Sequence, residues 1–72
     1  MVLNLKEIRK RRGLTQEALS MVSNVNRANI AKYETNTSVP SLKTCEKLAN
    51  SLGVTVDELI GKEGAKNDDP GD

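Results

Sequence analysis

The chain has 72 residues, enough for one small domain, and 36% of them are apolar and 29% charged. It contains no His and a single cysteine, Cys45, which excludes a His-based catalytic triad, a zinc site and an internal disulfide. No apolar run approaches the roughly 20 residues that a membrane span needs. The first ten residues also lack the apolar core of a signal peptide, so we expect a cytoplasmic protein. We expect no cofactor.

The net charge of +1 conceals two halves of opposite sign. Residues 1–33 carry seven Lys and Arg against two Glu, for a charge of +5, whereas residues 34–72 carry four Lys against eight acidic residues, for −4. This segregation indicates either a positive face for a polyanion or a solvated basic helix end. Residues 62–72 are acidic and hold no large apolar side chain, so we expect a disordered tail there and an ordered domain over 2–61.

The first helical signal lies at Asn4, which with Glu7 three residues later resembles a capping box. Leu5 and Ile8 continue an apolar face, and Gly13 is a natural residue to end the helix.

A second helix is predicted over "QEALSMV", with Thr15 as its N-cap. Ala18, Leu19 and Val22 lie on one stripe of that helix, which we expect to face the core. The segment "SNV" then breaks the pattern, because Asn24 can adopt the left-handed conformation that a turn requires.

Asn26 can cap a third helix that runs to about Thr35, and "NTSVP" follows as a loop. Ser41 can cap a fourth helix that continues through Leu52 and ends at Gly53.

One face of the fourth helix is apolar, which makes Cys45 a core residue rather than a reactive thiol; the face comprises Leu42, Cys45, Ala49 and Leu52. Thr55 with Glu58 forms a second capping box for a short fifth helix, "VDELI". Five short helices without a credible strand predict an all-α domain.

Only the segment "SNV" separates the second helix from the cap of the third, and so short a link predicts a helix-turn-helix. On a helical wheel Ile30 points inward, flanked by Tyr33 and Glu34. The outward face comprises Ala28, Asn29, Lys32 and Thr35, with Arg27 at its exposed N-terminal end.

This outward face suits the major groove of DNA, which admits one helix and displays a donor and acceptor pattern on each base pair. Arg can bond guanine, Asn can bond adenine, and Ala28 could touch a thymine methyl group. The alternative is a polar face that is merely solvated.

The residues over 3–60 resemble the Cro/C1-type (XRE-family) helix-turn-helix domain of phage repressors and small bacterial regulators. The resemblance rests on "LTQ" at 14–16, "NRANIAKYE" at 26–34, "PSL" at 40–42 and "LGVTVDEL" at 52–59. It implies a compact five-helix domain, like that of lambda repressor, that binds duplex DNA as a two-fold dimer and regulates transcription.

The resemblance also implies roles for individual residues. It implies that Arg27, Ala28, Asn29 and Lys32 contact base edges. It implies phosphate contacts for Gln16, Asn26, Thr37 and Ser38, of which Thr37 and Ser38 would use backbone and hydroxyl groups. Gln16 also matches a residue that often braces the first side chain of the recognition helix. Asn26 can cap the third helix and contact a phosphate at the same time, and we favour the cap. Arg9 and Glu34 match a pair that joins the first and third helices, which we expect to be structural.

Three residues depart from the family pattern. Asn24 and Asn36 stand where the family usually has Gly, which the backbone chemistry of Asn tolerates. Ser23 stands where a small or apolar residue is usual, so we expect a loosely packed turn.

We therefore expect a stand-alone repressor or a phage or mobile-element switch that reads a palindromic operator as a homodimer, without enzymatic activity. Val56, Leu59 and Ile60 either form the dimer contact or close the core. The residues identify neither a toxin nor an RNA polymerase contact, and they do not separate repressor from activator. The alternative function is a protein-interaction module, which the polar residues of the third helix disfavour.

Overall fold

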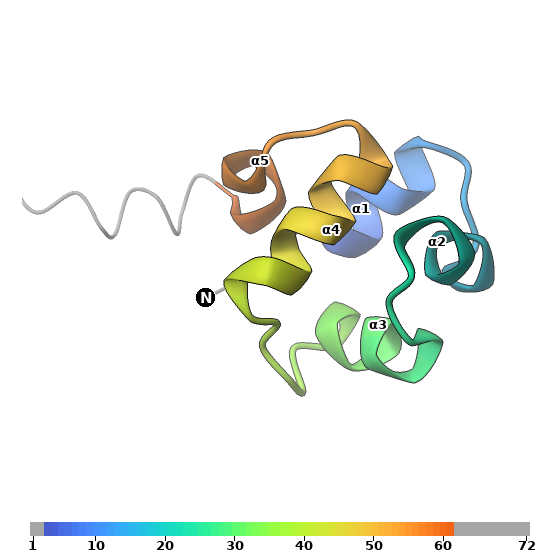
Figure 1. The fold of residues 1–72 in the computed structure, drawn as a ribbon, viewed down its shortest axis with the longest axis horizontal. Helices are drawn as coiled ribbons and strands as arrows, with labels where there is room; N and C mark the ends of the chain where they lie inside the picture. Colours follow the sequence, from blue (N-terminus) through green and yellow to red (C-terminus); the bar gives the residue numbers. More distant parts are fainter. Residues whose placement is uncertain (1–2, 62–72) are drawn as a thin grey trace, which may run out of the picture.

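The computed structural model describes residues 3–61. In this range the chain forms five helices and no strand. The helices are α1 (Leu5–Arg11), α2 (Gln16–Ser23), α3 (Arg27–Glu34), α4 (Leu42–Leu52) and α5 (Val56–Ile60). Figure 1 shows α4 crossing the middle of the molecule in front of α1, with α2 and α3 beside each other at one end and α5 at the other. The all-α prediction is confirmed.

The predicted domain limit at residue 2 and the predicted tail over 62–72 lie outside the described residues. Within residues 3–61, no helix has the length and apolar character that crossing a membrane requires.

Side-chain caps begin α2, α4 and α5 where the sequence predicts them. Thr15 Oγ1 accepts from the backbone N–H of Ala18 at 3.0 Å, and Ser41 Oγ accepts from that of Thr44 at 3.2 Å. Thr55 and Glu58 exchange both bonds of a capping box. These bonds satisfy backbone donors that have no partner inside their own helix.

The capping box predicted at Asn4 is wrong, because the Asn4 side chain makes no cap hydrogen bond to α1. Its Nδ2 donates instead to the carbonyl of Glu58, at 3.3 Å, and its backbone N–H donates to the carbonyl of Leu59, at 2.8 Å. Asn4 therefore ties the start of α1 to α5.

The core draws apolar side chains from all five helices and from the α2–α3 turn. Cys45 is 3% exposed, as expected of a core residue, and burial raises the pKa of its thiol above the usual value. The buried apolar residues are Leu5, Ile8, Leu19, Val25, Ile30, Tyr33, Cys45, Leu48, Ala49, Leu52 and Leu59.

Two residues expected on buried stripes are exposed. Val22 is 60% exposed, because the buried stripe of α2 runs through Leu19 and Ser23. Leu42 is 66% exposed, because it is the first residue of α4 and precedes the stretch of that helix that packs on the core, which begins at Cys45.

The α2–α3 turn is held by hydroxyl groups, which corrects the expectation of loose packing. Ser23 Oγ donates to the carbonyl of Leu19 at 2.6 Å and accepts from the N–H of Val25 at 3.3 Å. Ser20 Oγ donates to the carbonyl of Val25 at 2.7 Å. Asn24 is left-handed, with φ of 62°, so the backbone reverses without glycine, as predicted.

Candidate nucleic-acid interface

Helix α3 has one buried and one exposed face, and the division follows the predicted wheel. Ile30 is fully buried and Tyr33 is 8% exposed, which fixes the helix to the core. The exposed residues are Arg27, Ala28, Asn29, Lys32 and Thr35, of which Thr35 directly follows the helix. The face offers one guanidinium, one amide and one ammonium group around a small alanine.

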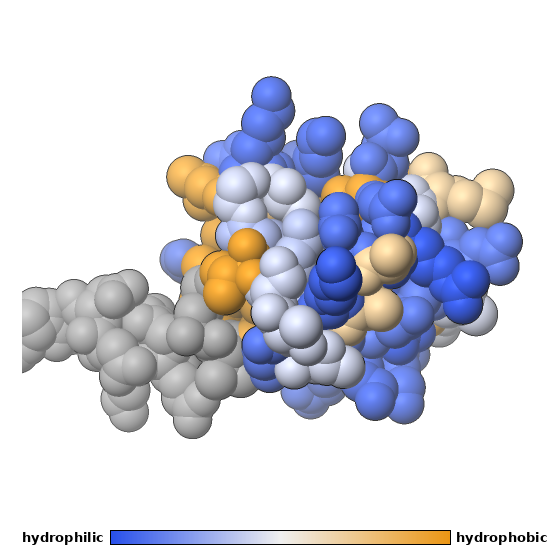
Figure 2. Space-filling model, turned by 90° about the horizontal axis from the view of Figure 1, so that it is seen from below, coloured by the Kyte–Doolittle hydropathy of each residue, from blue (hydrophilic) through white to orange (hydrophobic). Residues whose placement is uncertain are grey.

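Figure 2 looks onto the side of the molecule where α3 and the α3–α4 loop lie. Hydrophilic atoms cover most of the surface over α3, and the strongly apolar atoms gather toward the start of α4. Hydrogen-bonding chemistry therefore dominates the surface that α3 presents.

Asn26 caps α3 through its side-chain oxygen. Its Oδ1 accepts from the backbone N–H of Ala28 at 2.7 Å, so the capping role expected of Asn26 is confirmed. The side chain is exposed, and this bond uses only the oxygen of its amide. The Nδ2 group can still donate to an anion beside the start of α3.

The loop after α3 offers hydroxyl groups to an anion. The backbone N–H groups of Thr37 and Ser38 both point to the carbonyl of Lys32, at 2.8 Å and 3.4 Å. Both backbone donors thus have a partner within the protein, and the phosphate contact expected of Thr37 and Ser38 stays a prediction. The Thr37 hydroxyl lies 2.8 Å from the hydroxyl of Thr35, and Asn36 between them is left-handed with φ of 61°.

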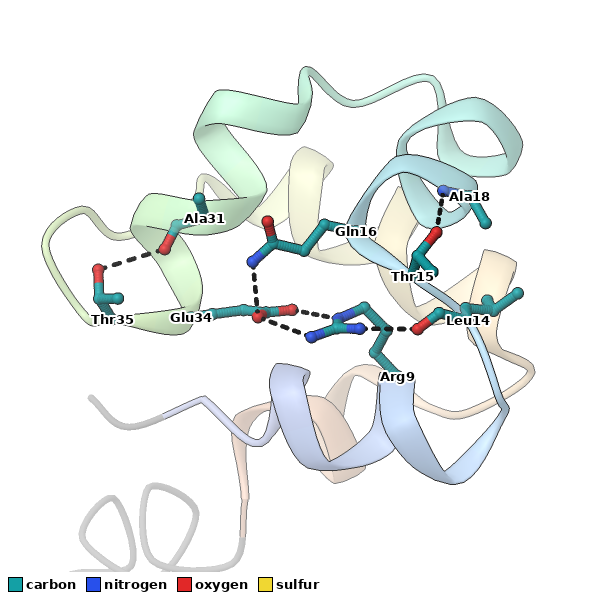
Figure 3. A network of polar contacts seen from close by, with 8 residues as sticks. All are labelled: Arg9, Leu14, Thr15, Gln16, Ala18, Ala31, Glu34 and Thr35. Atoms are coloured by element: carbon teal, nitrogen blue, oxygen red, sulfur yellow. Dashed lines mark hydrogen bonds and ion pairs between the residues drawn. The ribbon is translucent and has the colours of Figure 1, made fainter.

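A buried ion pair joins α1 to α3, as predicted. Arg9 Nε donates to Glu34 Oε2 at 2.6 Å and Arg9 Nη2 donates to Glu34 Oε1 at 3.1 Å, so the contact is bidentate (Figure 3). The Arg9 side chain is 9% exposed and the Glu34 side chain 3%. This is a structural pair, because burying either charge alone would be costly.

The pair reaches the start of α2 through two further bonds that the sequence did not predict. Gln16 Nε2 donates to Glu34 Oε1 at 3.0 Å, and Arg9 Nη1 donates to the carbonyl of Leu14 at 2.7 Å (Figure 3). Residues 14 and 16 flank the N-cap of α2. No spacing rule could have found these contacts, because Gln16 and Glu34 are 18 residues apart.

The titration of Glu34 reflects this network. Burial acts to raise its pKa, but hydrogen bonds from Arg9 and Gln16 and the charges of Arg9 and Lys6 outweigh burial. The pKa of Glu34 therefore lies below its usual value, and the carboxylate is ionised at neutral pH.

The expected dimer residues on α5 divide into two kinds. Leu59 is fully buried and belongs to the core, which corrects its assignment as a dimer contact. Val56 and Ile60 are half-buried, so part of each side chain faces outward.

Comparison with known proteins gives one family. The family model described as helix-turn-helix matches residues 5–59. The immunity repressor protein of Bacillus phage phi105 is 41% identical over 59 residues, which cover 82% of this chain and 41% of that protein.

Two regulators of Bacillus subtilis are also similar. The SPbeta prophage-derived uncharacterized HTH-type transcriptional regulator YonR is 38% identical over 56 residues, covering 78% of this chain and 52% of that protein. The HTH-type transcriptional regulator ImmR is 36% identical over 59 residues, covering 82% of this chain and 46% of that protein. The chain thus spans about half the length, or less, of the relatives it matches. The five-helix order and the family match over residues 5–59 show that the chain belongs to the Cro/C1-type helix-turn-helix family.

Proposed function

We propose that this protein is a transcriptional regulator that binds double-stranded DNA with α3 in the major groove. The observation that carries the proposal is the exposed face of α3, whose base-reading candidates stand on a helix fixed by Ile30 and Tyr33. A rigid support of this kind suits base recognition, because side chains must meet base edges at hydrogen-bond distances. The names of the similar proteins support a transcriptional regulator, and one of those proteins is a phage immunity repressor.

Base reading is assigned to four residues. Arg27 donates two bonds to a guanine, Asn29 exchanges two bonds with an adenine, and Ala28 contacts a thymine methyl group. Lys32, one turn beyond Ala28, donates to a base edge or to the adjacent phosphate.

Phosphate contacts flank the reading face on both sides. Gln16 and Asn26 offer amide N–H groups at the starts of α2 and α3, and Thr37 and Ser38 offer hydroxyl groups in the following loop. Such contacts position the protein on the duplex but do not read its sequence. Binding by the cations releases counterions, so the affinity falls as the salt concentration rises.

The DNA-bound form is a two-fold homodimer on a palindromic operator. One recognition helix buries too little surface for tight specific binding. Two copies place their helices in half-sites about 34–36 Å apart, one turn of the duplex. Val56 and Ile60, which are half-buried on α5, are the proposed dimer contact.

Nuclear magnetic resonance with ¹⁵N-labelled protein and a duplex tests this assignment. Amide signals of α3, of the start of α2 and of residues 35–38 should shift, whereas those in the middle of α4 should not. Shifts confined to α4 and α5, or none at all, would contradict the proposed DNA surface.

Analytical sedimentation measures the dimer. Ile60→Glu should weaken dimerisation while the monomer stays folded.

A further inference from the structure

We propose that Glu34 is a positioning residue for DNA binding, because its carboxylate fixes the side-chain amide of Gln16 at the proposed phosphate contact. The inference rests on the proposed function and deepens it. It concerns a residue on the inner side of α3 that cannot itself touch DNA, since its side chain is 3% exposed.

The chemistry of the partners sets the orientation of the Gln16 amide. An ionised carboxylate only accepts hydrogen bonds, so the group 3.0 Å from Glu34 Oε1 must be the NH₂ of Gln16 and not its carbonyl oxygen. Figure 3 shows the carbonyl oxygen of Gln16 pointing away from the pair. One N–H of Gln16 is donated to Glu34, and the other remains for a phosphate oxygen.

Arg9 completes the arrangement in two ways. Its bidentate contact holds both carboxylate oxygens of Glu34 and balances a negative charge that would otherwise repel a nearby phosphate. Its third bond, from Nη1 to the Leu14 carbonyl at 2.7 Å, fixes the chain just before α2. The ion pair therefore holds the start of α2 by the backbone at Leu14 and by the side chain at Gln16.

A freely rotating glutamine on a helix surface would lose side-chain entropy on meeting a phosphate. A glutamine already held by Glu34 has lost that entropy on folding, so the contact forms at lower cost. The DNA affinity contributed by Gln16 should consequently depend on Glu34. A purely structural role for Glu34 predicts no such dependence.

A double-mutant cycle on DNA affinity tests this dependence. The probe is the duplex that the wild-type protein enriches from a random pool, and all variants are measured well below their melting temperatures. Gln16→Ala should weaken binding about two- to tenfold in the wild-type background, the size of one net hydrogen bond. In a Glu34→Asp background, which keeps a negative charge for Arg9, Gln16→Ala should cause little further loss, because the shorter side chain withdraws its carboxylate from the Gln16 amide.

Thr37→Ala is the matched control, since Thr37 is a proposed phosphate contact outside the network of Glu34. Its loss of affinity should be the same in both backgrounds. If Glu34→Asp does not fold, the double substitution Arg9→Met with Glu34→Leu takes its place, because it removes the acceptor for Gln16 and leaves no unpaired buried charge.

Equal losses for Gln16→Ala in both backgrounds would overturn the positioning role and leave the proposed function standing. A wild-type protein that enriches no duplex would overturn the proposed function, and the positioning role with it.

Discussion

Arg9 on α1 and Glu34 on α3 form a bidentate ion pair, 2.6 Å between Arg9 Nε and Glu34 Oε2, in which both side chains are almost fully buried. The same two residues hold the start of α2 through Leu14 and Gln16. Three helices thus meet at one pair of charges. The network thus helps to hold α2 and α3 in the relative placement on which the proposed DNA surface depends.

Glu34→Ala should destabilise the fold by about 3–5 kcal/mol, because it leaves the Arg9 guanidinium buried without its partner. Urea unfolding measures the loss. Glu7→Ala is the control, since it removes an exposed partner of Arg11 in an i,i+4 pair, which should cost about 0.5 kcal/mol or less. A similar effect of the two substitutions would show that the buried pair does not stabilise the fold.

The stability should fall on acidification through Glu34. Its pKa is lower in the folded chain than in the unfolded one, so its contribution is complete above the unfolded-state value, about 4.3 for Glu. The contribution is lost as the pH falls through the folded-state pKa. Urea unfolding between about pH 6 and pH 3 should show a smaller loss for Glu34→Gln than for the wild type. Parallel curves would contradict the assignment.

Asn24→Ala should destabilise the fold by about 1–2 kcal/mol, because alanine tolerates the left-handed conformation poorly. Asn24 has φ of 62° at the turn between α2 and α3. Asn24→Gly is the matched control and should leave the melting temperature unchanged or raise it, since glycine adopts this conformation freely. If alanine and glycine behaved alike at this position, the turn geometry would be wrong.

Arg27→Ala should weaken binding to the preferred duplex by about 1–3 kcal/mol and relax the sequence preference at one base position. Fluorescence anisotropy on single-base variants of the duplex measures both effects. Lys47→Ala, which removes one exposed cation from α4, is the control for the change in net charge. An equal loss on every duplex would show that Arg27 binds phosphate instead of a base.

The local parts of the fold were predictable from sequence. The caps at Thr15, Ser41 and Thr55 and the left-handed turn at Asn24 each depend on a few neighbouring residues. The two faces of α3 were also predictable, because they follow from its helical period.

Features that depend on distant parts of the chain were not predictable. Asn4 donates to α5 rather than capping α1, and Val22 and Leu42 are exposed although they continue apolar stripes. Leu59 is a core residue because α5 packs on α1 and α4, which periodicity over a helix of five residues cannot reveal. The hydrogen bond from Gln16 to Glu34 has no sequence signature at all.

Selection of bound duplexes from a random DNA pool, at near-physiological salt, tests whether this protein reads DNA sequence as a two-fold dimer. We expect an enriched palindrome whose two half-sites are centred about one helical turn apart, as a two-fold dimer with α3 in the major groove requires. A pool without enrichment, bound only weakly and in a salt-sensitive manner, would contradict sequence-specific recognition and favour a protein-interaction module.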